Sequence, residues 1–525
     1  MSHEGKMTYV SLTADESIHV MYEEALRKVE GEFGRHHPMF IGESQVYSHE
    51  GEFEDRSPID KTIILGYFQR GNQQHARAAV AESKKAFPEW SAREWRERVR
   101  IVRAVADRAE RARFELAALI TYEVGKNRYE ALAEVGEAID MLRYYCDIYE
   151  RNGGYVTPMG PGAPGERCWS VMRPYGVWAV ISPFNFPFAL AAGMTAAALL
   201  TGNTVVFKPT SEAPLSGLRL YQLYIEAGVP PGAINFVTGP GGAFGEAIVA
   251  HPDVDGIAFT GSRDVGMWLY RNFAAKQPYP KPFIAEMGSK NPTIVTAKAD
   301  LEKAVEGVTR AAFGYGGQKC SATSRVYVHT AVADEFVRRL RQRMEEITIG
   351  DPRKREVFLG PLINEAAAAR FREACETASR SGGEVIPGGR IVDERLVSRG
   401  PYVRPALITG LPKDHPLFKE ELFVPLLPVA TFTDLKEAVQ EANNTEYGLT
   451  AGIFSEDPAE IEYFFRHIQF GVCYANRRGG ATTGAWPGAQ AFGGWKASGA
   501  TGKGVGGPHY LLSYLREQAQ TVVEE

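Results

Sequence analysis

Residues 176–181 read Gly176-Val177-Trp178-Ala179-Val180-Ile181, and residues 204–207 read Thr204-Val205-Val206-Phe207. Both are short apolar runs of the kind that form buried strands. The stretch from Ser216 to Ala227 that follows them has the apolar spacing of a helix. Strands that alternate with helices in this way predict a parallel sheet with helices on both faces, so the expected fold class is α/β.

A second alternation of apolar and helical segments begins at Pro292-Thr293-Ile294-Val295 and continues to Phe454. It predicts a second α/β unit. The first part of the chain differs, because residues 21–33 and 91–148 have apolar residues at helical spacing. Glycines and prolines at 153–165 form the strongest break in the first half of the chain, and we place an excursion from the main body there.

The bulk composition excludes several classes of protein. The 525 residues are 44% hydrophobic and 23% charged, as in ordinary globular proteins. The formal net charge of -5 provides no basic field, so neither a nucleic acid nor a membrane surface is expected as a partner. The most apolar region, 175–207, is interrupted by Pro183, Asn185, Pro187 and Asn203, and is not predicted to span a membrane.

The cysteines point to a reducing compartment. The chain has five of them, an odd number, widely spaced and without a CxxC pair. Neither a disulfide framework nor a metal site is therefore indicated. Residues 1–7 lack the apolar run of a secretory signal, so we expect a cytoplasmic protein.

Two stretches point to covalent catalysis. Cys320 stands in Gly316-Gly317-Gln318-Lys319-Cys320, and Glu286 stands in Ala285-Glu286-Met287-Gly288. A thiolate is the strongest nucleophile among side chains near neutral pH, and a carboxylate can move its protons. Glycines beside the cysteine allow backbone amides to approach a substrate oxygen, as an oxyanion requires.

The two stretches resemble the signature of the aldehyde dehydrogenase superfamily, in which a glutamate in an E-L-G-G-K-like stretch precedes a cysteine in a G-Q-x-C stretch. Further matches follow in family order: Pro183-Phe184-Asn185-Phe186-Pro187, Gly202-Asn203-Thr204-Val205-Val206-Phe207-Lys208-Pro209, Phe259-Thr260-Gly261-Ser262, Glu421-Leu422-Phe423, Asn443-Asn444-Thr445-Glu446-Tyr447-Gly448-Leu449 and Phe492-Gly493-Gly494-Trp495-Lys496. The resemblance therefore covers nearly the whole chain.

The resemblance implies an aldehyde dehydrogenase-like fold with a variant Rossmann cofactor domain, an α/β catalytic domain and a small β oligomerisation arm. We accordingly assign residues 1–150 and 173–288 to the NAD(P)-binding domain, 289–497 to the catalytic domain, and 151–172 with 498–525 to the arm. Strands are expected at 168–172 and 510–515. A homo-oligomer is expected, as a dimer, tetramer or hexamer.

The resemblance also implies a mechanism for oxidising an aldehyde. Cys320 attacks the carbonyl, and the Asn185 amide with the Cys320 backbone N–H holds the oxyanion. Glu286 activates the water that hydrolyses the resulting thioester to a carboxylic acid. A CoA-acylating semialdehyde dehydrogenase is the nearest alternative. Relatives that pass the acyl group to coenzyme A tend to lack this glutamate, so its presence favours a free carboxylic acid as product.

NAD or NADP is the implied cofactor. The implied cofactor residues are Ser182, Pro183, Phe184, Lys208, Ser211, Gly245, Gly261, Ser262, Glu421 and Phe423. Gly245 ends a glycine turn that follows an apolar run and opens a helix, as at dinucleotide sites. Ser211 stands where NAD-preferring relatives often carry a glutamate that repels a 2′-phosphate, so we predict measurable turnover with NADP.

Within the superfamily, Glu123-Val124-Gly125-Lys126-Asn127 and Glu137-Ala138-Ile139-Asp140 resemble the 1-pyrroline-5-carboxylate dehydrogenases. Enzymes of that group oxidise L-glutamate γ-semialdehyde to L-glutamate in proline catabolism. By this resemblance Ser321, Gly484 and Ala485 bind the α-carboxylate of the substrate, while Phe186 and Phe492 pack on its aliphatic chain.

The chain departs from that pattern at several positions. Ser289 replaces a glycine, Val424 replaces the glycine of an E-x-F-G-P pattern, and Ala491 replaces a proline. The loop that begins at Arg477-Arg478 and leads to Trp486 is also longer than expected. These departures concern the substrate, and they leave another semialdehyde or an aromatic aldehyde open.

Overall fold

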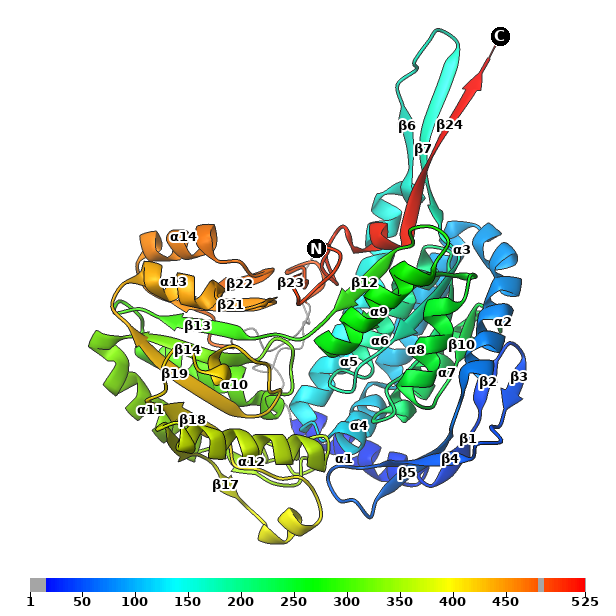
Figure 1. Ribbon diagram of the computed structural model, residues 1–525. Coiled ribbons are helices and arrows are strands. Elements are labelled where there is room, and N and C mark those ends of the chain that lie inside the picture. The colour runs from blue at the N-terminus through cyan, green and yellow to red at the C-terminus, as the bar shows by residue number, and fades with distance from the viewer. Residues whose placement is uncertain (1–15, 480–485, 525) are drawn as a thin grey trace.

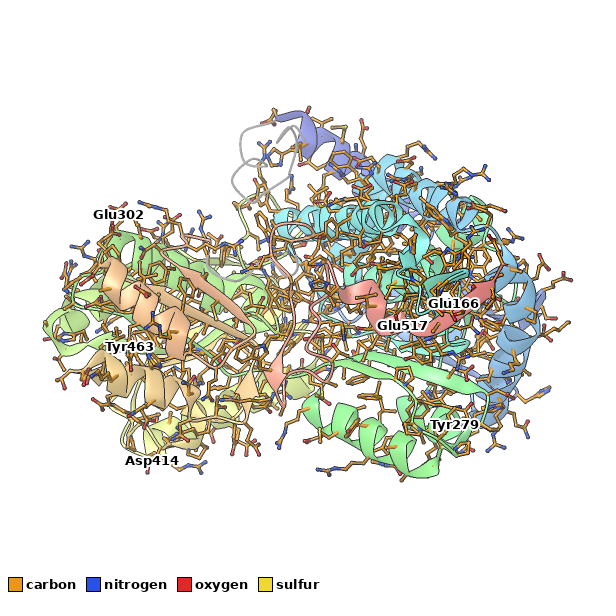
Figure 2. All side chains as sticks on the ribbon, turned by 90° about the horizontal axis from the view of Figure 1, so that it is seen from above. Glu166, Tyr279, Glu302, Asp414, Tyr463 and Glu517 are labelled. Atoms are coloured by element: carbon orange, nitrogen blue, oxygen red, sulfur yellow. The ribbon has the colours of Figure 1, made fainter. Side chains whose placement is uncertain are left out.

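The computed structural model describes residues 16–479 and 486–524. Figure 1 shows two lobes side by side and a long β arm that projects from one of them. Figure 2 views the molecule from above, with Glu302, Tyr463 and Asp414 on one lobe and Tyr279 on the other. In the described parts of the chain, no helix is both long enough and apolar enough to cross a bilayer.

The first lobe is built on a seven-stranded sheet. In spatial order its strands are β12 (Phe283–Glu286), β11 (Val254–Thr260), β8 (Val177–Ile181), β9 (Thr204–Lys208), β10 (Ile234–Phe236), β2 (Met39–Ile41) and β3 (Ser44–Val46). The first five strands run parallel, which confirms the parallel sheet predicted from residues 176–227. Strands β2 and β3 extend it in the antiparallel sense, and the sequence did not predict them.

Helices surround this sheet, and α6 (Ala189–Leu200) packs on its central strands β8 and β9. Every residue of α6 is buried, because its alanine-rich sequence has no polar face. Gly193 of α6 lets α5 approach, since a Cβ there would lie 2.9 Å from Met141 Sδ. The remaining helices of this lobe are α1 (Glu16–Glu30), α2 (Gln73–Ala92), α3 (Trp95–Arg111), α4 (Arg113–Val124), α5 (Arg128–Arg151), α7 (Pro214–Ala227), α8 (Gly241–Ala250) and α9 (Arg263–Lys276). A small sheet of β1 (Arg35–His37), β5 (Ile64–Gln69) and β4 (Glu52–Arg56) adjoins them.

The second lobe also has a seven-stranded sheet, which confirms the second α/β prediction. Its strands in spatial order are β16 (Glu384–Pro387), β18 (Ala406–Thr409), β19 (Leu426–Phe432), β14 (Thr323–His329), β13 (Asn291–Val295), β21 (Thr450–Phe454) and β22 (Val472–Ala475). All neighbours are parallel except β16 and β18. Its helices are α10 (Leu301–Phe313), α11 (Ala333–Glu345), α12 (Glu365–Arg380), α13 (Leu435–Asn443) and α14 (Pro458–His467). Two short pairs, β15 (Thr348–Ile349) with β17 (Arg390–Ile391) and β20 (Tyr447–Gly448) with β23 (Trp495–Lys496), complete the strands of this part.

The arm consists of β6 (Val156–Met159), β7 (Glu166–Pro174) and β24 (Leu515–Val523), in the antiparallel order β24, β7, β6. The strand expected at 168–172 is part of β7. The strand expected at 510–515 is wrong except for its last residue, since Tyr510–Tyr514 forms a 3₁₀ turn with buried Tyr510 and Tyr514. The polar segment after it forms β24 because its backbone pairs with β7 along nine residues. The division into domains and the association role of the arm stay predictions.

Candidate active site

A cavity of about 740 Å³ lies where the carboxyl ends of β8, β9 and β11 meet the second lobe. Ligands bind at this end of open parallel sheets. Its lining includes most of the predicted catalytic and cofactor residues: Ser182, Pro183, Phe184, Asn185, Lys208, Ser211, Gly261, Ser262, Cys320, Glu421 and Phe423. Residues about 240 positions apart in the chain thus share one cavity.

The nucleophile is presented by an unusual turn after α10. Tyr315, Gly316 and Gly317 have φ values of 51°, 63° and 67°, so three successive residues are left-handed. A Cβ on Gly317 would lie 2.6 Å from the carbonyl oxygen of Val424, which explains the glycine. Beyond the turn, the Asn291 side chain donates to the carbonyl oxygen of Cys320 over 2.7 Å and fixes the backbone there.

The electrostatics of the site keep the Cys320 thiol protonated. Burial raises its pKa, and the carboxylates of Glu286 and Glu421 raise it further. A thiolate therefore needs a proton acceptor close by. Asn185 lines the same cavity and is 4% exposed, so an amide donor stands in the cavity with the thiol.

Glu286 is the last residue of β12 and is 6% exposed. One carboxylate oxygen, Oε2, accepts the backbone N–H of Gly494 at 3.0 Å. Burial raises the pKa of this carboxyl to about 8, and the Gly494 hydrogen bond opposes part of the rise. Glu286 is not among the residues that line the cavity, yet its carboxylate raises the pKa of the Cys320 thiol. A base with this pKa is suited to general base catalysis near neutral pH.

Several cavity residues have groups that suit a dinucleotide. The Ser182 hydroxyl is buried and has no hydrogen-bond partner in the described structure. Ser262 is the N-cap of α9, whose N-terminus provides amides and a dipole for phosphate. Lys208 donates to the Pro209 carbonyl at 2.8 Å, and burial lowers its pKa to about 8. Ser211 donates its hydroxyl to the Gly239 carbonyl at 3.1 Å.

Glu421 and Phe423 enter the cavity from the second lobe. Glu421 accepts the backbone N–H of Ser289 at 2.7 Å, and burial raises the pKa of its carboxyl to about 7. A Cβ on Gly288 would lie 2.3 Å from Glu421 Oε2, so a glycine there admits the carboxylate. Phe423 has a φ of 58° and packs edge-on against Phe184, with ring centroids 5.9 Å apart. The second lobe thus brings a carboxylate and an aromatic ring to the cavity, and their cofactor roles stay predictions.

Gly245 is the one predicted cofactor residue outside the cavity lining. It lies within α8, where a Cβ would come within 3.1 Å of the Trp268 ring of α9, so it serves the packing of two helices. Gly241, from the same glycine turn, lines the cavity instead. The lining also includes residues that sequence reasoning did not assign: Thr210, Glu212, Arg263, Met287, Arg370, Leu422 and Tyr447. Glu212 follows Ser211, and Tyr447 stands in the 443–449 stretch that matches the family, so both had a local signal, whereas Arg370 belongs to no local motif.

The predicted substrate residues are only partly described. Ser321 is 1% exposed, and its hydroxyl oxygen has no hydrogen-bond partner among the described residues. Phe186 and Phe492 are both buried. Gly484 and Ala485 lie outside the described residues, so their assignment stays a prediction.

The three departures from the family pattern are accommodated locally. The Ser289 hydroxyl accepts the Asn291 side-chain N–H at 3.0 Å. Val424 is buried, and its carbonyl faces Gly317. Ala491 packs closely on Gly507, since a Cβ added to Gly507 would lie 2.7 Å from the Cβ of Ala491.

Comparison with known proteins identifies the family and the fold of the chain. The family model described as "Aldehyde dehydrogenase family" matches residues 46–520. A curated relative from Geobacillus sp. (strain WCH70), named 1-pyrroline-5-carboxylate dehydrogenase, is 36% identical over 507 residues, covering 96% of each chain. A solved 1-pyrroline-5-carboxylate dehydrogenase from Thermus with bound NAD is 34% identical, with a TM-score of 0.92, over 100% of this chain and 99% of that one. A solved E. coli NADP-dependent enzyme is 31% identical, with a TM-score of 0.86, over 94% and 99% of the two chains.

These matches extend over nearly the full length of each chain. They confirm the aldehyde dehydrogenase-like fold predicted from the Cys320 and Glu286 motifs. The chain belongs to the aldehyde dehydrogenase family and is an oxidoreductase.

Proposed function

We propose that this protein oxidises L-glutamate γ-semialdehyde, the open form of 1-pyrroline-5-carboxylate, to L-glutamate, with NAD as hydride acceptor. The observation that carries the proposal is that the Cys320 thiol and the Asn185 amide line one cavity, while the buried Glu286 carboxyl acts electrostatically on that thiol. The names of the Geobacillus and Thermus relatives support the substrate.

In the first step, the Cys320 thiol gives up its proton to solvent and its sulfur attacks the aldehyde carbon. The Asn185 amide and the Cys320 backbone N–H donate to the developing oxyanion. The chemistry that a bound NAD supplies is acceptance of the hydride, which leaves a thioester on Cys320. Glu286 then takes a proton from water, whose oxygen attacks the thioester and releases the acid.

The substrate assignment rests on Ser321. Its buried hydroxyl has no described partner and stands one residue after the nucleophile. A buried hydroxyl without a partner costs stability, so a ligand oxygen at this place would satisfy it. The semialdehyde has a carboxylate at the far end of a short chain, and we propose that Ser321 donates to it while Phe186 and Phe492 pack on the methylenes.

NAD is proposed as the main cofactor and NADP as a weaker one. Ser211 provides no negative charge, yet Glu212 lines the same part of the cavity and brings a carboxylate close to it. A negative side chain near a ribose disfavours an added 2′-phosphate. We therefore keep the prediction of measurable NADP turnover and expect it to be slower than turnover with NAD.

The arm suggests how copies of the chain associate. Strands β24 and β6 are the two edges of a three-stranded sheet, and nearly all of their residues are exposed. Unpaired strand edges of this kind readily join another chain. We propose that the arm holds a homo-oligomer together, and the mass in solution of a chain ending at residue 514 tests it, since an unchanged assembly would contradict the idea.

The proposed activity is tested by following cofactor reduction with a panel of aldehydes: glutamate semialdehyde, succinic semialdehyde, glutaraldehyde and benzaldehyde, each with NAD and NADP. Glutamate semialdehyde with NAD should give the highest kcat/KM, and glutamate should appear as product without coenzyme A. Cys320→Ser is the matched inactive control. A clear preference for benzaldehyde over every carboxylated aldehyde would contradict the substrate assignment.

A further inference from the structure

Lys126 is a buried lysine that takes no part in the chemistry described above. It follows Gly125, whose left-handed φ of 75° ends α4. It precedes Asn127, whose side chain caps α5 by accepting the N–H groups of Tyr129 and Glu130 at 3.1 and 3.0 Å. The turn between the two helices directs Lys126 inward, and its exposed fraction is 0%.

The ammonium of Lys126 is paired with an equally buried carboxylate. Its Nζ lies 2.6 Å from Glu134 Oε2, and both side chains are fully buried. The other oxygen of Glu134 accepts the N–H of Phe188 at 2.9 Å and of Ala189 at 3.2 Å, at the start of α6. Glu134 therefore joins the Lys126 ammonium to the end of the segment that carries Asn185.

The same ammonium contacts two aromatic rings. Its Nζ lies 3.5 Å from the ring centroid of Phe186 and 4.9 Å from that of Tyr315, within the range of cation–π attraction. Phe186 follows Asn185 in the chain, and Tyr315 stands five residues before Cys320 in the left-handed turn. The Tyr315 hydroxyl also donates to the Val124 carbonyl at 2.8 Å. One cation thus contacts both loops that bring the reacting groups together, one from each lobe.

Stability alone does not explain this arrangement. Desolvating an ammonium and a carboxylate is costly, and apolar residues of the same size often serve a core equally well. What an ion pair adds is a fixed geometry for the groups around it. We propose that Lys126, held by Glu134, is a positioning residue of the active site: it fixes the Phe186 and Tyr315 rings and thereby the relative position of the Asn185 amide and the Cys320 thiol. The inference rests on the proposed function.

The test removes both charges together, so that no buried charge is left without a partner. In Lys126→Met with Glu134→Gln, kcat with glutamate semialdehyde should fall about 10- to 100-fold, as displaced catalytic groups typically cause. The KM for the aldehyde should rise, because Phe186 packs on it in the proposed mode, while the KM for NAD should stay unchanged. If the first double variant does not fold, the same kcat and KM values are measured on Lys126→Gln with Glu134→Gln, which can keep a hydrogen bond between the two side chains.

A second buried cation offers a matched control. Lys281 lies 3.9 Å from Asp255 and 5.1 Å from the ring centroid of Tyr279, with a 2% exposed side chain. Figure 2 shows Tyr279 at the outer edge of its lobe, and none of the three lines the cavity. Lys281→Met with Asp255→Asn should lower Tm and leave kcat and both KM values unchanged.

Two kinetic results would overturn the inference: unchanged kcat and aldehyde KM in the folded Lys126 variant, or equal losses in the Lys281 variant. A crystal structure of the Lys126 variant gives a readout that needs no substrate. Displaced Phe186 and Tyr315 rings would support the role, and unmoved rings with an unmoved Asn185 amide would reject it. If the wild type fails to oxidise glutamate semialdehyde, the proposed substrate is wrong, and the crystal comparison still tests Lys126.

Discussion

The raised pKa of Glu286 makes a quantitative prediction for the second half of the reaction. Burial raises the pKa to about 8, and only the ionised carboxylate can take a proton from water. About one carboxyl in eleven is then ionised at pH 7 and about ten in eleven at pH 9. A steady-state rate limited by thioester hydrolysis should therefore rise about tenfold between pH 7 and pH 9.

Glu286→Gln separates this step from the ones before it. The glutamine keeps an oxygen for the Gly494 N–H but cannot act as a base. Steady-state turnover should fall by a factor of about 10² to 10⁴, the usual contribution of a general base. Stopped-flow absorbance should still show a burst of reduced cofactor close to one equivalent per chain, and intact-mass spectrometry should find the acyl group on Cys320.

Because burial and neighbouring carboxylates also raise the pKa of the Cys320 thiol, the burst rate has its own pH dependence and must be measured separately. Asp255→Asn is the control, since burial raises the pKa of this acid too, but it lies outside the cavity. Its pH profile should match that of the wild type. A Glu286→Gln variant that retains wild-type turnover, or one that loses the burst with no acyl-enzyme, would refute the assignment of Glu286 to hydrolysis.

Three further predictions follow from the site and the core. Asn185→Ala should lower kcat by about 10² to 10³ with little change in Tm, as loss of an oxyanion donor does; a normal kcat would remove Asn185 from the scheme. Glu212→Gln should raise kcat/KM for NADP about fivefold, since one like charge in a solvated site is worth about 1 kcal/mol, and Glu212→Asp should not. Burial raises the pKa of Asp55 and raises that of Glu123 to about 7, so the folded state holds protons more tightly than the unfolded state. Stability should therefore fall as pH rises from about 4 to about 7, and Asp55→Asn should flatten that change in a Tm series.

Local sequence predicted the elements that are buried on both faces. Residues 177–181 and 205–207 are continuous apolar runs, and their pairing into a parallel sheet follows from the alternation of strands with helices. Local sequence failed at β24, because its residues are polar and exposed and only the distant β7 makes them a strand. The strand expected at 510–515 is largely wrong because the buried residues of a 3₁₀ turn, Tyr510 and Tyr514 among them, give the same local apolar pattern as a strand.

The candidate active site shows the same limit on what local sequence can predict. Cys320, Glu286 and Asn185 were recognisable because each stands in its own short motif. Arg370 lines the cavity without any such motif, since its position depends on how the second lobe packs against the first. Gly245 was assigned to the cofactor from a glycine-turn pattern, whereas the fold uses it to bring α8 and α9 together.

The Gly494 amide that contacts Glu286 lies 208 residues further along the chain. The same late segment holds both neighbours of Glu286, since Met287 donates to the Ser498 carbonyl at 2.9 Å and Ala500 donates to that of Ala285 at 3.1 Å. A ribosome must therefore translate at least as far as residue 500 before these contacts around the acid can form. Cleavage after residue 490 would remove all three of these contacts while leaving Cys320 in the remaining chain.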